Sequence, residues 1–266
     1  MFVILTGSSG VGKNTVIKNL IEEDNKFVLM PTYTTRQKRE GEIEGNPYFY
    51  LTKEEFQDKI KHNDFIEYEL IHTNFYGSSL SIFEDYLKKG KIILKDIGVE
   101  GAQNLKIKLA GKTEIIKLFL TTKSKRDLKN RLKGRKEKQI KLRLKRYSYE
   151  QKQKNKFDYI IINQNLDVTI DTINKVISLK NDDFLPYKNT KRISKYFVKY
   201  YMNKLQAGKI LKPIKIALKG EKAYIISGVE KFIASILTQK PVAKLIVNKE
   251  IKKIVPVDKD WFKKVL

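Results

Sequence analysis

The stretch FVILTGSSGVGKNT, residues 2–15, decides the fold of this chain because a short apolar run leads straight into a glycine-rich turn. The run Phe2–Leu5 has the form of a strand buried on both faces, and a helical pattern follows from Lys13 to Glu23. Glycines let the backbone wrap around an anion, and a helix N-terminus adds partial positive charge. Strand, loop and helix in this order predict a phosphate-binding loop.

Each residue type in this loop suits the binding of a triphosphate. Successive N–H groups point inward, and the ammonium group of Lys13 reaches the β- and γ-phosphates. Asn14 stands where Ser or Thr usually ligates Mg²⁺, so we assign the ligating hydroxyl, or its contact through water, to Thr15. The residues predicted to bind the phosphates of ATP are Ser9, Gly10, Val11, Gly12, Lys13, Asn14 and Thr15.

Three more apolar runs follow, at residues 91–94, 114–120 and 159–162, with helical patterns between them. Apolar strands that alternate with helices indicate right-handed crossovers and a mainly parallel sheet covered on both sides. Residues 1–180 are therefore predicted to form one α/β domain. Asp96 ends the second run, where open α/β sheets place catalytic residues.

The composition is strongly basic and free of cysteine. With 55 Lys and Arg against 30 Asp and Glu, the formal net charge is +25, which indicates a phosphate-bearing partner, either nucleotide or nucleic acid. A lysine-rich surface that only stays solvated would give the same charge. The lack of cysteine excludes disulfides and thiolate ligands, and the two histidines, His62 and His72, lack metal-site spacing.

No stretch of the sequence is typical of a membrane segment. The apolar opening is too short for a signal peptide, and no run reaches the roughly 18 apolar residues of a membrane helix. We expect a cytoplasmic protein without a membrane partner.

The acceptor-binding part carries a family resemblance. Residues 31–45, PTYTTRQKREGEIEG, resemble the TTR-x-x-R-x-GE-x-x-G stretch of guanylate kinases, and residues 46–50 continue it. Residues 64–68 and 74–79 resemble the FIE and YG-[ST] elements of that family. The resemblance covers residues 2–178 and implies a P-loop NTPase fold with a parallel sheet core, an acceptor-binding insertion and a lid. It also implies an enzyme that moves the γ-phosphate of ATP to GMP or dGMP with Mg²⁺.

The chemistry of these motifs suits a monophosphate. A phosphate dianion needs cations and hydroxyl donors, which two arginines and two tyrosines supply. The resemblance makes these four side chains the phosphate clamp, and makes Glu67 the acceptor for guanine N1–H and N2–H. The substrate-binding residues that it implies are Thr32, Arg36, Arg39, Tyr48, Glu67, Tyr76 and Ser78.

The segment 96–101, which starts at Asp96, differs from the family pattern. By resemblance it holds Mg²⁺ through water or organises the acceptor phosphate, although an ordinary strand-end aspartate is the alternative. The family reads D-x-D-x-x-G here, whereas this chain has Gly98 in place of the second acid. Glu67 is then the main guanine reader, with Glu100 as a candidate substitute. The base, and even a different small phosphate acceptor, stays open.

The basic stretch 126–156 is either a solvated helix pair or a phosphate-facing lid. Residues 131–135 and 140–144 resemble the RL-x-GR and I-x-x-RL motifs of the family lid, with fewer residues between them. Arginines on a closing lid neutralise charge that develops during phosphoryl transfer. The predicted catalytic residues are Lys13, Asp96, Arg131, Arg135 and Arg143.

The segment 181–189 breaks the helical periodicity and reads as a linker. Behind it, residues 190–266 are predicted to form a small α+β domain, whose element order is similar to the ParB/sulfiredoxin-like fold. Gly228, Lys231 and Ala234 match a phosphate-binding turn of that fold, but Glu230 replaces a basic residue, and an acid there repels anions. A structural or partner-binding role is therefore favoured over a second active site.

Three functions remain to be separated. The first is an ATP-dependent nucleoside monophosphate kinase, and the second is a non-catalytic guanylate-kinase-like module, which typically lacks the phosphate loop. Retention of Gly12 and Lys13 favours the first. The third is a nucleotide-sensing regulator that binds nucleic acid through tyrosines at positions 196, 200 and 201 and nearby lysines, although such tyrosines also pack as one helix face. The oligomeric state stays open.

Overall fold

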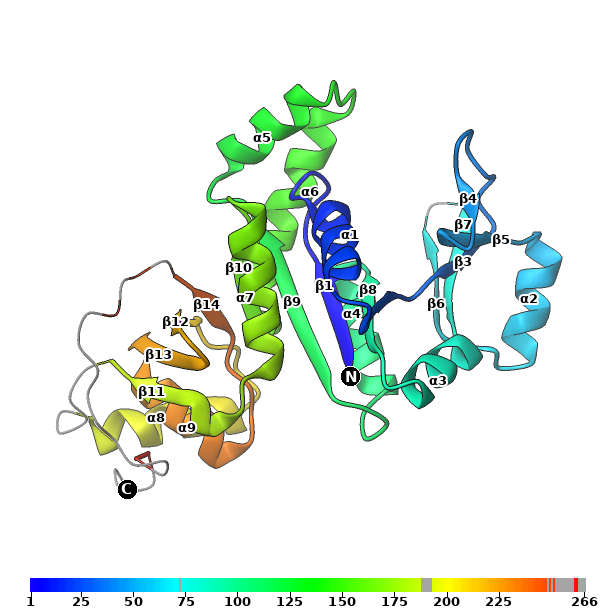
Figure 1. The fold of residues 1–266 in the computed structure, drawn as a ribbon. Coiled ribbons are helices and arrows are strands. Elements are labelled where there is room, and N and C mark those ends of the chain that lie inside the picture. The colour runs from blue at the N-terminus through cyan, green and yellow to red at the C-terminus, as the bar shows by residue number, and fades with distance from the viewer. Residues whose placement is uncertain (72, 188–192, 248, 250, 252–260, 263–266) are drawn as a thin grey trace. The chain divides into compact units, whose positions relative to one another are not determined.

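The computed structural model describes residues 1–71, 73–187, 193–247, 249, 251, 261 and 262 (Figure 1). His72 and the end of the predicted linker, residues 188 and 189, lie outside the described residues. The chain divides into two compact units. The first unit comprises Met1–Gly7 and Gly12–Lys117, and the second comprises Ser8–Val11 and Leu118–Leu266.

The first unit contains a parallel core of three strands. Strand β8 (Ile92–Asp96) pairs with β1 (Phe2–Thr6) on one side and with β2 (Phe27–Leu29) on the other. Every residue of β1 is buried, as expected for a strand covered on both faces. The predicted strand and helix around the glycine-rich turn are confirmed. The helices of this core are α1 (Lys13–Glu23), α3 (Leu80–Lys88) and α4 (Val99–Lys108).

A second sheet in the first unit, here called the small sheet, follows the order β4-β5-β3-β7-β6 (Figure 1). Its strands are β3 (Thr32–Thr34), β4 (Ile43–Glu44), β5 (Pro47–Tyr50), β6 (Phe65–Ile71) and β7 (Asn74–Ser79). Helix α2 (Lys53–Lys61) begins with a capping box of Thr52 and Glu55. Its Phe56 stacks on Phe65 and Phe75 with ring centroids 4.5 and 5.2 Å apart, so α2 covers one face of the sheet.

The second unit carries a mixed sheet. Strand β10 (Tyr159–Ile162) pairs in parallel with β9 (Ile115–Thr121) and with β14 (Lys244–Ile246). Strand β14 pairs in parallel with β12 (Ile214–Lys219), which forms an antiparallel hairpin with β13 (Lys222–Ser227). Strand β11 (Phe184–Pro186) completes the sheet beside β13. The α/β prediction is confirmed, and the C-terminal hairpin makes this sheet mixed.

The helices of the second unit fall into three groups. The basic stretch forms the pair α5 (Lys125–Gly134) and α6 (Ile140–Gln153), and α7 (Leu166–Ser178) follows β10. The part of the chain from residue 184 onward is here called the C-terminal segment. In it, α8 (Lys195–Gln206) packs against α9 (Val229–Thr238), which contacts β12 (Figure 1). Short 3₁₀ turns occupy Lys154–Lys156 and Asn181–Asp183.

The C-terminal segment has an aromatic core of its own. Phe232 of α9 lies 5.2 Å from Phe184 and 6.2 Å from Trp261, measured between ring centroids, and the Trp261 indole N–H donates to the Phe184 carbonyl at 3.0 Å. Strand β13, the turn at Gly228, helix α9 and strand β14 follow one another along the chain, as expected of a small α+β unit. The division into domains 1–180 and 190–266 stays a prediction, because β14 joins this segment directly to β10.

No helix within the described ranges is both long and apolar enough to cross a bilayer.

Candidate active site

A cavity of about 810 Å³ opens within the first unit, beside α1 and the small sheet. Apolar side chains of Ile17, Ile21, Leu29 and Met30 form part of its wall. Its polar wall contains most of the side chains predicted to bind the acceptor. The predicted residues that line it are Asn14, Thr32, Arg36, Arg39, Tyr48, Tyr76 and Asp96.

Four of the predicted substrate-binding residues form a row across the small sheet. Tyr48 of β5 pairs with Thr32 of β3, and the β3–β7 register continues the row to Ser78. Ser78 in turn pairs with Glu67 of β6. Side chains of paired residues point to the same face of a sheet. The row therefore faces away from the aromatic side that α2 covers, and this alignment depends on pairing between strands that are distant in sequence.

Glu67 and Ser78 form the buried end of this row. Their exposed fractions are 6% and 0%, and the Ser78 hydroxyl donates to Glu67 Oε1 at 2.5 Å. Neither side chain is part of the cavity wall, whereas Thr32 and Tyr48 are. The carboxylate of Glu67, predicted to read the base, therefore lies beside the cavity residues but is not exposed in the cavity wall.

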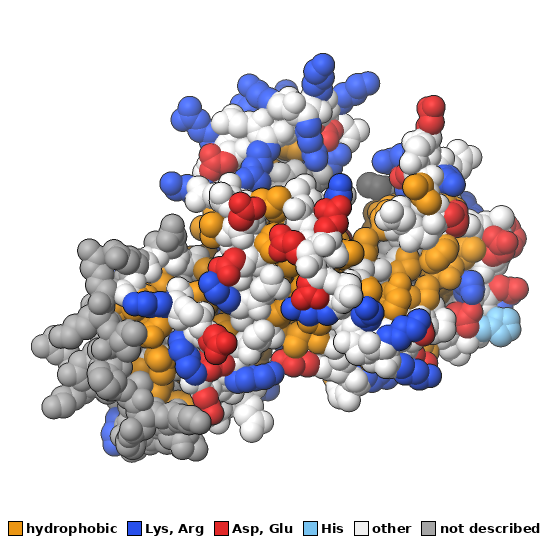
Figure 2. All heavy atoms as spheres, in the orientation of Figure 1, with side chains coloured by type: hydrophobic (Ala, Val, Ile, Leu, Met, Phe, Trp, Pro, Cys, Tyr) orange, Lys and Arg blue, Asp and Glu red, His pale blue; other side chains and the backbone are white. Residues whose placement is uncertain are grey.

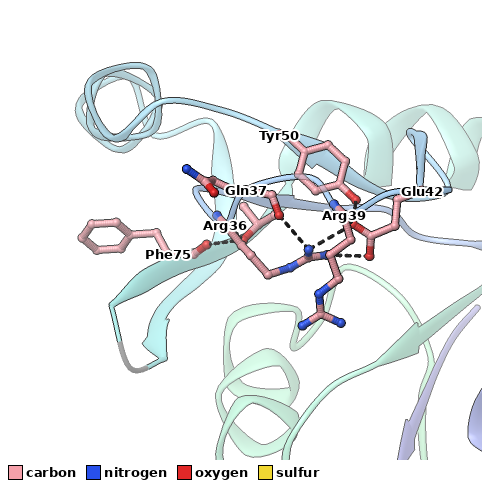
Figure 3. A network of polar contacts seen from close by, with 7 residues as sticks. Arg36, Gln37, Arg39, Glu42, Tyr50 and Phe75 are labelled. Carbon is pink, nitrogen blue, oxygen red and sulfur yellow. Dashed lines mark hydrogen bonds and ion pairs between the residues drawn. The ribbon is translucent and has the colours of Figure 1, made fainter.

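Arg36 is held by a carboxylate to which the sequence analysis gave no role (Figure 3). Its guanidinium donates to both oxygens of Glu42, at 2.9 and 3.0 Å, and Tyr50 donates to the same carboxylate at 2.7 Å. The hydrogen bond from Arg36 is the main cause that lowers the pKa of Glu42 to about 2. Glu42 therefore stays ionised and holds Arg36 against the cavity wall.

Arg39 differs from Arg36 in the hydrogen bonding of its guanidinium group. Its backbone N–H donates to Glu42 at 2.8 Å, but its guanidinium extends away from that carboxylate (Figure 3). Within the described part of the chain, this guanidinium has no acceptor, although it lines the cavity. Arg39 is therefore the cation that an incoming anion can engage directly.

The two predicted tyrosines lie together in the cavity wall. The rings of Tyr48 and Tyr76 meet edge to face at 6.4 Å, and Arg36 lies 5.0 Å from the Tyr48 ring centroid. Burial, followed by the charge of Asp96, raises the pKa of Tyr48 above its ordinary value. Its hydroxyl stays protonated at neutral pH and can donate to an anion.

The first unit also places the loop lysine beside the strand-end aspartate. Lys13 Nζ donates to the Gly7 carbonyl at 2.5 Å and lies 3.7 Å from Asp96 Oδ1. Gly12, with φ of 101°, begins α1 without a side-chain cap, so the N–H groups of the first turn face outward. Thr15 is exposed in this turn, next to Asn14.

The cavity of the first unit offers few protein ligands for Mg²⁺, and this ion needs only a few. The described residues contain no group of three or more His, Cys, Asp or Glu that could hold a metal ion. Mg²⁺ commonly takes one or two carboxylates and completes its shell with water and substrate phosphates. The Asp96 carboxylate and the Asn14 amide both line the cavity and supply oxygen atoms of this kind.

In the second unit, α5 packs on the other part of the loop. Gly10 has φ of 97°, and a Cβ atom there would lie 2.8 Å from Leu132 Cδ2 of α5. Arg131 donates to the Val11 carbonyl at 3.0 Å, and Arg135 donates to Ser9 Oγ at 3.0 Å. Two of the three predicted lid arginines therefore already contact the loop.

Arg143 occupies a different place. Its Nε lies 2.7 Å from Glu137 Oε2, and Arg135 also approaches Glu137 at 3.5 Å. The backbone N–H of Gln139 and then the charge of Arg143 hold the pKa of Glu137 below its usual range. Arg143 is thus paired with Glu137, and no hydrogen bond or ion pair joins it to the described loop residues.

Exposed lysines lie on α5, on α6 and in the turn between them, where Figure 2 shows basic side chains gathered. The arginines Arg131 and Arg135 point to the loop instead. The basic stretch therefore has solvated lysines and two arginines that contact the loop, and its role as a lid stays a prediction. The exposed lysines are Lys129, Lys133, Lys136, Lys138, Lys141 and Lys145.

Two residues that hold the glycine-rich loop, Glu150 and Asn163, were not predicted from the sequence. Ser8 donates to the buried carboxylate of Glu150, which also pairs with Arg146 at 3.0 Å. The Asn163 amide donates to the Val11 carbonyl at 2.8 Å. An isolated acid in the basic helix α6 and a polar residue directly after β10 were the available signals.

Lys95 was also missed, although it lies under the row of the small sheet. It is 2% exposed, and its Nζ donates to Thr32 Oγ1 at 2.6 Å and to the Pro31 carbonyl at 3.3 Å. Burial lowers its pKa to about 8, against the opposing charges of Glu67 and Asp96. The signal in the sequence was a lysine that continues the apolar run of β8.

Comparisons with known proteins agree with this geometry. A family model described as guanylate kinase matches residues 1–180. The guanylate kinase of Prochlorococcus marinus (strain MIT 9312) is 42% identical over 178 residues, which cover 66% of this chain and 95% of that relative. The guanylate kinase of Clostridium tetani (strain Massachusetts / E88) is 36% identical over 181 residues, 67% of this chain and 85% of that relative. The crystal structure of guanylate kinase from Anaplasma phagocytophilum is similar with a TM-score of 0.54 and 27% identity, over 66% of this chain and 84% of that one.

Proposed function

The chain belongs to the guanylate kinase family, and from this membership we propose that it transfers the γ-phosphate of ATP to GMP. The observation that carries the proposal is the cavity of the first unit, in which two arginines and two tyrosines of the predicted clamp share one wall. Cations and neutral hydroxyl donors at one place suit a phosphate dianion. dGMP is an alternative acceptor of the same chemistry.

Each part of the acceptor site has a separate role in this proposal. Arg39 binds the acceptor phosphate directly, and Arg36 does so from the position in which Glu42 holds it. The hydroxyls of Tyr48 and Tyr76 donate to the same phosphate. The guanine base is read by the polar row, through Thr32, Glu67 and Ser78.

We propose that the glycine-rich loop binds ATP, the phosphate donor. Backbone N–H groups of residues 9–15 and the ammonium group of Lys13 hold the phosphates of ATP. Arg131, Arg135 and Arg143 supply the charge that stabilises the transferring group, for which Arg143 must leave Glu137. Asp96 with Thr15 or Asn14 would hold Mg²⁺, which neutralises phosphate charge when bound.

The reaction needs no separate general base. An oxygen of the GMP phosphate attacks the γ-phosphorus of ATP, the bond from that phosphorus to the bridging β–γ oxygen breaks, and the leaving oxygen stays with ADP. The acceptor oxygen is already anionic, so the protein acts by positioning and by charge stabilisation. Since ATP is the donor, we also propose a cytoplasmic location.

A coupled ADP-release assay with GMP, dGMP, AMP, CMP, UMP and dTMP tests this function. We expect turnover with GMP or dGMP and loss of turnover in a Lys13→Met variant of the same chain. Turnover with a different acceptor would replace GMP by that acceptor. No turnover with any acceptor would leave a nucleotide-binding module.

A nucleic-acid-binding role for the C-terminal segment, predicted from its similarity to the ParB-like fold, is a second candidate. What favours it is an exposed aromatic group on α8, where Tyr196 is 72% and Phe197 49% exposed. Lys204 lies 4.3 Å from the centroid of the Tyr200 ring on the same helix. Aromatic rings beside cations suit the stacking of single-stranded bases. Binding of a mixed-sequence oligonucleotide that falls steeply with salt supports the role, and no binding at low salt removes it.

A further inference from the structure

Lys95 fixes the direction of one hydrogen bond at the cavity wall. An ammonium group only donates, so in the 2.6 Å contact Thr32 Oγ1 is the acceptor. The hydroxyl proton of Thr32 then has to be donated elsewhere. The structure gives this hydroxyl no other partner among the described residues, and Thr32 lines the cavity. Thr32 is therefore prepared to donate a hydrogen bond to a ligand.

The same cation acts on the other end of the row. Lys95 and Glu67 are close enough to interact electrostatically. A carboxylate only accepts hydrogen bonds. Ser78 donates to Glu67 Oε1, and the described residues make no other hydrogen bond to this carboxylate. The row therefore has a donor at Thr32, in the cavity wall, and an acceptor at Glu67, beside the cavity residues.

We propose that Lys95 is a specificity-determining residue, which sets this donor–acceptor order and so selects a purine monophosphate with an oxo group at position 6. The inference rests on the proposed kinase function and deepens its acceptor site. A 6-oxopurine presents an acceptor at O6 and a donor at N1–H, which complement Thr32 and Glu67. Adenine presents an amino donor and a bare N1, so both contacts would meet a group of the same kind.

A lysine is an unusual choice for this position if packing alone is required. The neighbouring residues of the strand, Ile93 and Leu94, are fully buried apolar side chains. A buried ammonium group is costly compared with an apolar side chain of the same shape. Lys95 is a positioning residue in this proposal because it acts through Thr32 and Glu67. The competing explanation is that Lys95 only ties β8 to the segment before β3.

IMP and AMP separate these explanations because they differ only in the group that Lys95 is proposed to select. We would measure kcat/KM for IMP, AMP and GMP in the full chain and in a Lys95→Met variant. The wild-type chain should favour IMP over AMP by about 10²-fold or more, and the variant should lose at least about 10-fold of that ratio. A purely structural role lowers activity with all three acceptors equally, and an unchanged ratio overturns the proposal.

A double-mutant cycle with Thr32→Val tests the route of the effect. If Lys95 acts through Thr32, the double variant should discriminate IMP from AMP no worse than the Thr32→Val variant does. Losses that add independently would overturn this route. Lys95→Arg, which keeps the charge and the donors, should restore part of the ratio.

Equilibrium binding of IMP and AMP distinguishes failure of this inference from failure of the proposed function. Calorimetry on the same chains gives the ratio of dissociation constants even if no acceptor is turned over. Absent turnover with a binding ratio that falls in Lys95→Met removes the kinase function and keeps the role of Lys95. A binding ratio near one in the wild-type chain removes that role. Thr32→Val supplies the same comparison if Lys95→Met does not fold.

Discussion

The small sheet of the first unit and the C-terminal strands β11–β14 of the second are built from strands of similar length but use their faces differently. In the small sheet, one face is aromatic and covered by α2, and the other presents the polar row. In the C-terminal hairpin, Ile216 pairs with Ile225 and Ala217 pairs with Tyr224, and all four side chains are buried. A sheet with one polar face can form a site, whereas a sheet that is apolar on both faces serves as scaffold.

Glycines in the two regions illustrate the same difference. A Cβ atom at Gly77 would lie 2.9 Å from Phe56, and one at Gly228 would lie 2.8 Å from Ile214. Both glycines are therefore required for close packing against an apolar side chain. The match of Gly228 to a phosphate-binding turn is explained by this packing without any ligand.

The largest expected effect concerns the scaffold. Phe232→Ala removes the ring that packs between Phe184 and Trp261, and should lower the free energy of unfolding by about 3–5 kcal/mol. Thermal unfolding followed by circular dichroism measures the loss. Kinetics with GMP, taken at a temperature where the variant is folded, should be unchanged. A large loss of kcat/KM in the folded variant would contradict the separation of scaffold and site.

Arg36→Met should have the opposite profile. Removing the guanidinium from the cavity wall should lower kcat/KM for GMP by about 10²–10³-fold, because a charged donor to the acceptor phosphate is lost. The matched control is Arg126→Met, which changes an exposed arginine of α5. Steady-state kinetics of both variants make the comparison. Equal losses in the two would show that general charge, and not the clamp, matters.

Glu42→Gln tests how Arg36 is held in the cavity wall of the first unit. The amide can accept only weakly from Arg36 and Tyr50, so Arg36 should become less well positioned. We expect KM for GMP to rise about 10-fold with a smaller change in kcat. KM for ATP serves as the internal control and should stay constant. A rise in both constants would indicate a folding defect.

The smallest effect is expected at the C-terminal turn. Glu230→Lys introduces the kind of basic residue that the ParB-like pattern contains, at the start of α9. If this turn is scaffold, kcat/KM for GMP should change less than about twofold, because Glu230 is only partly buried and lies outside the proposed acceptor site. Isothermal titration with ATP would detect a second nucleotide site. Such a site in the wild-type chain would contradict the scaffold interpretation.

The chain segments that carry local patterns were predictable. The glycine loop with the strand and helix around it follows from periodicity and turn residues, and the structure contains these elements at β1 and α1. The helices α5 and α6 lie where the family resemblance implied the lid. The acceptor residues were found by their motif. Glu42, Lys95 and Glu150 were missed, because a single charged residue in a turn, strand or helix is usually a solvated one. Their roles depend on partners that the local sequence does not reveal.

The sequence by itself determined which side chains are available to bind phosphate and where the loop begins, because both depend on neighbours along the chain. Only the tertiary structure decided that Thr32, Ser78 and Glu67 stand in one row, and that Lys95 donates to Thr32 across 63 positions of sequence. Strand register and burial are set by packing between distant segments. Local periodicity therefore predicts neither the register between distant strands nor the burial of a single charged residue.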